Sequence, residues 1–184
     1  HQGRHEMFRG RLVACHEVPA RLDHVRAELQ RRALGSLHEP AIDDAALDAA
    51  IARVHDPRYV AFLAHAWDEW VALDPSNAQR DALPSVWPLG NPHAFRRDRP
   101  PANFAARLGL YAFDAGTPLM AGTWTAARSG AACALAAARA VQDGQRAAFA
   151  LTRPPGHHAG PDFFGGYCFL NNAAIAAQAL RDAG

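Results

Sequence analysis

The sequence has no cysteine pattern for disulfides or zinc and no strong net charge. Its three cysteines are an odd number without Cys-x-x-Cys spacing, which predicts neither a disulfide framework nor a cysteine-based zinc site. A reducing compartment, the cytoplasm, is therefore the default expectation. The formal net charge is only +1, so no overall field favours nucleic acid or an anionic membrane as a partner.

A membrane span and a signal peptide are also not predicted. The chain opens with His1-Gln2-Gly3-Arg4, without a basic start followed by an apolar run. The longest apolar stretch, Leu119 to Val141, contains Arg128 and Arg139, and charges at those depths are costly in lipid. We predict a buried helix there, in a single domain, since 184 residues of which 49% are apolar supply one core.

Helical periodicity and capping residues predict most of the chain's regular structure. Thr117-Pro118 has the pattern of a cap followed by proline at the first helical position. Trp67 and Trp70 are expected to pack at a helix surface against the core. We predict helices over residues 19–34, 43–51, 58–73, 117–141 and 171–184.

Two short apolar runs predict strands, at residues 36–42 and 147–152. The second run is followed by a loop rich in polar and aromatic residues and then by a helix. This order is typical of an open α/β sheet, in which ligands gather at the carboxyl ends of the strands. The predicted fold class is α/β.

Residues 74–103 have little periodicity and many prolines. A long proline-rich loop inside a compact domain is usually functional or an assembly element. It could wrap a neighbouring subunit, form the rim of a pocket, or be a surface insertion without a role. Its prolines are Pro75, Pro84, Pro88, Pro92, Pro100 and Pro101.

The most informative stretch is residues 151–172, LTRPPGHHAGPDFFGGYCFLNN. Pro154 and Pro155 end the preceding strand, and Gly156 permits a sharp bend, so the loop brings His157 and His158 to a strand end. Further on, three glycines allow close approach of a ligand to the backbone. Flat apolar walls for a substrate would come from Phe163, Phe164, Tyr167 and Phe169.

His157 and His158 are the candidate proton-transfer groups. Adjacent residues in an extended segment point to opposite faces, which disfavours joint chelation of a metal. We expect two acid/base groups, each held through its other ring nitrogen by a carboxylate, that titrate as a coupled pair. The alternative is a pair of structural or merely exposed histidines.

The same motif resembles the histone deacetylase superfamily. RPPGHHAG at residues 153–160 and GGYCFLNNAAIAA at 165–177 are similar to the motif of that family. RVHDPRYV at 53–60 and YAFDAGTPLMAGTW at 111–124 strengthen the match, which runs from about residue 15 onward. The sequence is most similar to the branch of bacterial acetylpolyamine amidohydrolases.

The resemblance implies an arginase-deacetylase fold, a parallel sheet with helices on both faces, present here as its N-terminal portion. It also implies zinc-dependent hydrolysis of N-acetyl amines with release of acetate. His157 and His158 would be tandem acid/base residues beside the attacking water. The Gly166 carbonyl would accept from the substrate amide, and Tyr167 would line the substrate tunnel. Asp114 would bind substrate or order the rim loop, unless it is only an exposed loop aspartate. The resemblance also implies that Cys168 is a packing residue.

Two departures from the family pattern affect these expectations. The family's metal ligands, an Asp-x-His and a later Asp, would lie beyond Gly184, so the 184 residues alone are expected to be inactive. Zinc is expected, with ferrous iron as the alternative. At the rim, Ala105, Arg107 and Gly116 stand where the acetylpolyamine branch tends to be acidic. Arg107, together with Arg96, Arg97 and Arg99, would repel a polyamine unless these side chains point away, which leaves acetyl-lysine as the other substrate class.

Three hypotheses about the whole protein follow. The first is a deacetylase that the resemblance implies to be a homodimer, with the 74–103 loop closing a partner's entrance. The second is a noncatalytic binding module that keeps the pocket without the metal half. The third is a manganese-dependent arginase-like hydrolase, which the tandem histidines after Pro-Pro-Gly disfavour.

Overall fold

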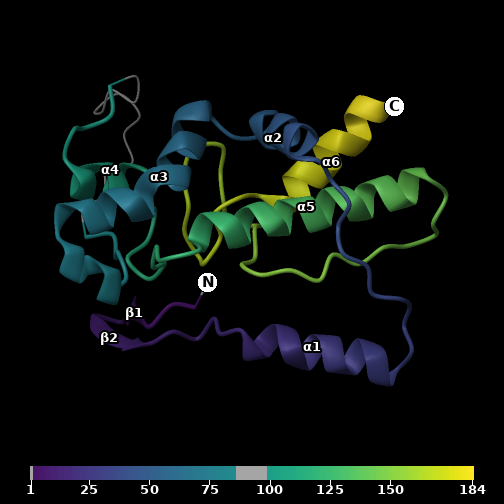
Figure 1. Cartoon of the computed structure of the whole chain (residues 1–184), viewed down its shortest axis with the longest axis horizontal. Helices are drawn as coiled ribbons and strands as arrows, with labels where there is room; N and C mark the ends of the chain where they lie inside the picture. The colour runs from purple at the N-terminus through teal and green to yellow at the C-terminus, as the bar shows by residue number, and fades with distance from the viewer. Residues whose placement is uncertain (1, 86–98) are drawn as a thin grey trace.

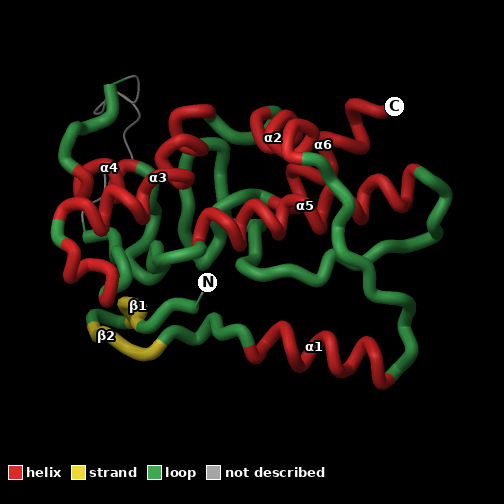
Figure 2. Tube along the Cα trace, in the orientation of Figure 1, coloured by secondary structure: helices red, strands yellow, loops and turns green. Residues whose placement is uncertain are grey.

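The computed structural model describes residues 2–85 and 99–184, and helices make up most of its regular structure (Figures 1 and 2). The described residues form a β-hairpin, six α-helices and one 3₁₀ helix. In chain order these are β1 (His5–Phe8), β2 (Arg11–Ala14), α1 (Ala20–Arg31), α2 (Asp44–Ala52), α3 (Pro57–Leu73), η1 (Pro75–Gln79), α4 (Phe104–Leu110), α5 (Thr123–Gln142) and α6 (Asn172–Ala183).

The hairpin β1–β2 was not predicted. Its two strands are antiparallel, and Phe8 is paired with Arg11 across a two-residue turn. Arg9 and Gly10 in that turn have φ values of 50° and 76°, the signs that a tight hairpin turn of the I′ class requires. Glu6 is the one buried residue of the two strands, so the hairpin inserts a carboxylate into the interior.

Side-chain caps begin most of the helices, as the sequence predicts for α2 and α6. Asp43 accepts from the backbone N–H of Ala46 at 2.9 Å, and Asn171 accepts from that of Ala174 at 3.0 Å. Asp56 caps α3, which has proline at its first position. The short helix α4, which was missed, begins with a similar cap from Asn103.

The predicted helix start at Thr117-Pro118 is wrong. Helix α5 begins six residues later, at Thr123, after Gly122 with φ of 75°. The Thr117 side chain does not cap a helix, because its hydroxyl hydrogen-bonds to Asp114 and to the backbone of Tyr167. The contact with Tyr167 comes from a residue 50 positions away in the sequence, which a local capping pattern does not contain.

The two predicted strands are also wrong. Residues 36–42 and 147–152 have no strand conformation, and the only strands among the described residues are those of the hairpin (yellow in Figure 2). A strand needs a neighbour that supplies hydrogen-bond partners, and no described strand lies beside residues 147–152. Phe149 in that run is 69% exposed, so the parallel sheet is not formed within the described part of the chain.

Helix α5 runs through the middle of the molecule (Figure 1). Its buried face consists mostly of alanines and Gly130, and a Cβ atom at Gly130 would lie 2.6 Å from Thr152 Oγ1. Arg128 pairs with Asp44 and Asp48 of α2 at 2.7 Å each. Among the described helices, none combines the length and apolar character that crossing a bilayer would need.

The hydrophobic core lies between α5 and the helices α2, α3, α4 and α6. Trp67 and Trp70 pack against it half-buried, as predicted, and the Trp70 ring stacks on Phe104 with centroids 5.7 Å apart. Helix α1 has no buried residue and lies along one side of the molecule (Figure 1). The residues of the hydrophobic core that are at most 1% exposed are Ile51, Tyr59, Ala66, Ala82, Leu119, Ala131, Phe164, Phe169, Leu170 and Ile175.

Candidate active site

The loop after residue 152 brings His157 and His158 together. Their ring centroids are 4.2 Å apart with an interplanar angle of 44°, and both residues are exposed. The segment is a turn in which the Ala159 N–H donates to the Gly156 carbonyl at 3.1 Å. The expectation of an extended segment with opposed side chains is therefore wrong, because the turn rotates both rings to one side.

Gly156 is required for close packing and not for its backbone angle. Its φ is not positive, but a Cβ atom there would lie 2.5 Å from the Leu170 carbonyl oxygen and 2.7 Å from the Asn172 nitrogen. Any side chain at this position would push the histidine turn away from the start of α6. The glycine thus fixes where the two imidazoles lie.

Two further glycines make room for an aromatic wall beside His158. A Cβ atom at Gly160 would clash with the ring of Phe163, and one at Gly165 with the ring of Phe113. The Phe113 ring contacts the His158 ring edge-on, with centroids 6.3 Å apart. It also contacts the Phe163 ring edge-on, with centroids 5.8 Å apart. Phe113 is 49% exposed, so this wall faces solvent next to the imidazoles. Phe113 was not predicted as part of the site, although it directly precedes Asp114.

Phe164, which was predicted to be an apolar wall for a substrate, lies in the hydrophobic core. Its side chain is fully buried and stacks on Phe169 with centroids 5.3 Å apart. Its backbone ties the loop to the segment before Asp114, because its N–H donates to the Tyr111 carbonyl at 2.7 Å and its carbonyl accepts from Phe113 at 3.0 Å. The ring that contacts His158 is that of Phe113, which in turn contacts the half-buried Phe163.

Gly166 and Tyr167 form a tight left-handed turn. Gly165 and Cys168 exchange backbone hydrogen bonds of 3.1 and 2.9 Å across it, and the two central residues have φ values of 55° and 62°. Such signs define the I′ class. A side chain in this region costs about 1–2 kcal/mol, so Tyr167 must be held there by other contacts. A Cβ atom at Gly166 would lie 2.5 Å from His158 Cδ2, which means that the ring packs directly on the turn.

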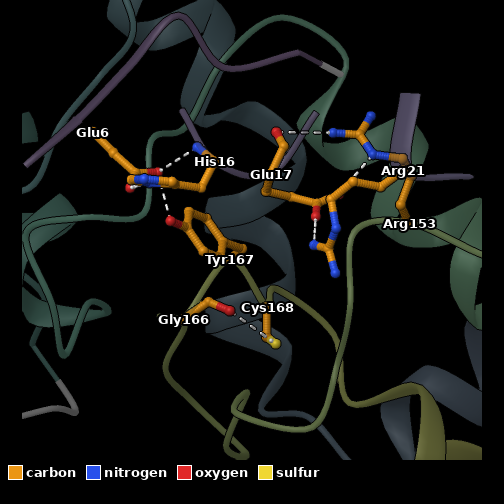
Figure 3. A network of polar contacts seen from close by, with 8 residues as sticks. All are labelled: Glu6, His16, Glu17, Arg21, Arg153, Gly166, Tyr167 and Cys168. Carbon is orange, nitrogen blue, oxygen red and sulfur yellow. Dashed lines mark hydrogen bonds and ion pairs between the residues drawn. The ribbon is translucent and has the colours of Figure 1, made fainter. Parts of the chain in front are cut away.

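The Tyr167 hydroxyl donates to a buried carboxylate (Figure 3). It lies 2.5 Å from Glu6 Oε2, and the other oxygen of Glu6 is 2.5 Å from Nδ1 of His16. Burial opposes ionisation of Glu6, but the hydrogen bonds from Tyr167 and His16 outweigh it and lower its pKa. Burial and the nearby Glu6 raise the pKa of Tyr167, so its hydroxyl remains protonated.

Tyr167 also lines a small hollow. Neither His157 nor His158 belongs to its lining, and both rings face solvent, although His158 packs on the adjacent Gly166. The hollow is lined by Gly3, Cys15, Glu17, Thr117, Pro118, Met120, Tyr167 and Phe169.

Asp114 points its carboxylate toward backbone N–H groups. Oδ1 accepts from Thr117 at 2.9 Å and from Gly116 at 3.2 Å. Oδ2 accepts from the Gly166 N–H at 2.6 Å. These contacts join the 114–117 turn to the Gly166 turn.

Cys168 packs beneath the site. It is fully buried, and its thiol donates to the Gly166 carbonyl at 3.3 Å. Burial raises its pKa, although the backbone N–H groups of His158 and Ala159 act in the opposite direction. The thiol therefore remains protonated and joins the histidine turn to the Gly166 turn.

His55 was also missed as a part of the site. It is 2% exposed, and its Nε2 accepts from the backbone N–H of Asn171 at 3.0 Å. Burial lowers its pKa, while hydrogen bonds to the backbone of Pro161 and Gly160 act against this. His55 thus supports the loop from the α3 side as a neutral imidazole. The signal was present in the motif RVHDPRYV.

A metal centre is not visible in the part of the chain that the structure describes. No group of three or more His, Cys, Asp or Glu side chains gathers there in a way that could hold an ion. The described residues therefore do not by themselves fit a catalytic metal, which needs about three protein ligands.

The arginines of the rim differ in their accessibility. Arg107 forms an ion pair with Glu69 of α3, which offsets its charge. Arg99 is exposed. The other two rim arginines, Arg96 and Arg97, lie outside the described residues.

The chain is similar in sequence to known acetylpolyamine amidohydrolases. The chain is 45% identical over 184 residues to acetylpolyamine amidohydrolase 2 of Pseudomonas aeruginosa, covering 100% of this chain and 51% of that protein. It is 39% identical over 186 residues to the acetylpolyamine amidohydrolase of Mycoplana ramosa, covering 97% and 50%. The chain thus spans about half the length of the curated relatives that it matches.

A solved structure confirms the predicted deacetylase fold. The crystal structure of acetylpolyamine aminohydrolase from Burkholderia pseudomallei matches with a TM-score of 0.84 and 41% identity, over 99% of this chain and 50% of that one. The family model of the histone deacetylase domain matches residues 15–184. This chain belongs to the histone deacetylase family.

Proposed function

We propose that this chain is the proton-transfer portion of a metal-dependent deacetylase that removes acetyl groups from N-acetylated amines and releases acetate. The observation that carries the proposal is the close pair of imidazoles, 4.2 Å apart, packed against the Gly166 turn. Two groups of this kind at one place can take a proton from water and return one to a leaving amine.

His157 and His158 have the acid/base roles in this proposal. Their rings lie close enough, 4.2 Å between centroids, for one to take a proton from water and for the other to give one to the leaving amine. The chain's relatives are named amidohydrolases, and cleavage of an amide requires protonation of its nitrogen as the bond breaks. Phe113 and the half-buried Phe163 would exclude water from the side of His158.

Substrate contacts would come from the Gly166–Tyr167 turn, with the Gly166 carbonyl accepting from the substrate amide and the Tyr167 ring as a wall. We propose an acetylated polyamine as the substrate, because the relatives cited above are named acetylpolyamine amidohydrolases. Acetyl-lysine is the other candidate. The ion pair of Arg107 with Glu69 reduces the repulsion that an arginine-rich rim would exert on a cation.

The catalytic metal of the proposed enzyme would be zinc, or alternatively ferrous iron. It would polarise the amide carbonyl and activate water. We propose that its ligands lie outside these 184 residues. The parts of this chain described above would then orient the substrate and move protons.

We also propose a cytoplasmic homodimer in which the 74–103 segment reaches a partner's entrance. The segment contains η1, and its residues 86–98 lie outside the described part of the chain. Its length and proline content favour an assembly element. Light scattering on the protein expressed from its complete reading frame tests this proposal. A monomeric mass at micromolar concentration would exclude it.

An assay of acetate release tests the proposed activity. Protein from the complete reading frame would be offered acetylated polyamines and acetyl-lysine peptides, with and without a chelator. We expect hydrolysis of acetylpolyamines that the chelator abolishes and zinc restores. Preference for peptides would overturn the polyamine assignment, and binding without hydrolysis would favour a noncatalytic module.

A further inference from the structure

A side chain of the 114–117 segment holds the left-handed Gly166–Tyr167 turn in place. The Oγ1 atom of Thr117 accepts from the Tyr167 N–H at 2.9 Å and donates to Asp114 Oδ2 at 3.0 Å. The same oxygen of Asp114 accepts from the Gly166 N–H at 2.6 Å. Both inner N–H groups of the turn thus find their acceptors in one connected network.

The chemistry at Thr117 requires a hydroxyl group. Its single oxygen both accepts one hydrogen bond and donates another, which an alkyl group of the same shape cannot do. Thr117 is 1% exposed, so water has little access to replace that oxygen. Tyr167 has a φ of 62°, a conformation that surrounding contacts must maintain.

The turn is in direct contact with the proton-transfer pair. A Cβ atom at Gly166 would lie 2.5 Å from His158 Cδ2, so a shift of the turn displaces the imidazole. The Gly166 carbonyl is also fixed from below, by the Cys168 thiol at 3.3 Å. Thr117 therefore acts on the site through the turn, without touching either imidazole itself.

We propose that Thr117 is a positioning residue for deacetylation, whose hydroxyl locks the Gly166–Tyr167 turn so that the Gly166 carbonyl and the His158 ring keep their relative places. The effect on turnover rests on the function proposed above. The effect on the turn itself does not depend on it.

Three variants, made in the protein expressed from its complete reading frame, test the inference. Thr117→Val removes the hydroxyl at constant shape, and Thr117→Ser restores it. Thr123→Val is the matched control, because Thr123 is 2% exposed and its hydroxyl accepts from the Met120 N–H at 2.9 Å, away from the turn. Turnover of an acetylated amine and hydrogen exchange at the Tyr167 amide are measured for each.

We expect Thr117→Val to lower kcat roughly tenfold or more, the scale of a small misplacement of reacting groups. Thr117→Ser should stay near the wild-type kcat, as should Thr123→Val below its melting temperature. Exchange at the Tyr167 amide should accelerate in Thr117→Val alone.

Other outcomes separate the two proposals. Unchanged kcat and exchange in Thr117→Val, or equal losses in Thr123→Val, would overturn the positioning role. An inactive wild-type protein would overturn the proposed function, while amide exchange would still decide whether Thr117 holds the turn.

Discussion

Arg153 and Glu17 form a buried ion pair, with Nε and Oε1 2.8 Å apart and only 12% and 6% of the side chains exposed. Figure 3 shows the pair beside the Glu6–Tyr167 contact. Arg153 is the residue before Pro154, and Glu17 lies between β2 and α1. The pair therefore anchors the base of the histidine loop to the N-terminal segment.

Glu17→Ala should destabilise the protein strongly. Removing one partner of a buried pair deprives the other charge of its counterpart, which costs about 3–5 kcal/mol. The free energy of unfolding from urea denaturation measures the change. Glu28→Ala is the control, because Glu28 forms its ion pairs on the exposed face of α1 and exposed pairs contribute little. Equal effects of the two substitutions would show that the buried pair is not an anchor.

The stability of the protein should fall as the pH drops below about 6.5, where an ordinary histidine titrates. The pKa of His55 is lowered by burial, so below 6.5 the unfolded chain binds a proton that the folded chain does not. Stability then decreases with falling pH down to the folded-state pKa. Because Nε2 accepts from Asn171, protonation would also remove that hydrogen bond.

Thermal denaturation of His55→Gln between pH 8 and pH 5 provides the comparison for that prediction. Glutamine can accept a hydrogen bond but does not titrate in this range. The variant should be less stable at pH 8 and should lose less stability on acidification than the wild type. Parallel curves for both proteins would mean that His55 does not cause the acid loss.

Gly166→Ala should displace the His158 ring. The added Cβ atom would lie 2.5 Å from His158 Cδ2, and the resulting misplacement should lower kcat roughly a hundredfold. Gly144→Ala is matched to it, because Gly144 also has a positive φ, 96°, but no atom within 4 Å of such a Cβ. Steady-state kinetics should show normal turnover for Gly144→Ala. Normal turnover in Gly166→Ala would mean that the ring does not depend on this contact.

Tyr167→Phe should lower the folding stability of the protein, and the loss should be largest at neutral pH. The hydroxyl donates to ionised Glu6 at 2.5 Å, and a hydrogen bond to a charged group contributes about 1.5–3 kcal/mol. The lowered pKa of Glu6 means that this stability is present above its ordinary pKa of 4.5 and is lost as the pH falls through the folded-state value. The difference in melting temperature between wild type and variant should therefore narrow below pH 4.5. A difference that is constant down to pH 3 would contradict this assignment.

Local patterns predicted the helices α1, α2, α3 and α6 to within a few residues. Asp43 and Asn171 cap helices where the sequence indicates, because a cap and its N–H partner are three residues apart. The bounds of α3, Pro57–Leu73, also follow from local signals, a proline at the start and Asp74-Pro75 at the end. These features need no knowledge of distant contacts.

Long-range contacts account for what the sequence did not predict. Thr117 has the local pattern of a cap, but its hydroxyl is bound to Tyr167, 50 residues away. Glu6 meets Tyr167 across 161 residues, and no periodicity relates them. The imidazoles of His157 and His158 were recognised from their motif, whereas their position on a turn depends on how Gly156 packs against Leu170.

Turnover of His158→Ala and His157→Ala in protein from the complete reading frame tests the central claim most directly. We expect kcat for an acetylated amine to fall roughly a hundredfold or more in His158→Ala, the usual loss when an acid/base group is removed. The melting temperature should change little, since both rings are exposed. Full activity in both variants would contradict the proton-transfer role of the pair.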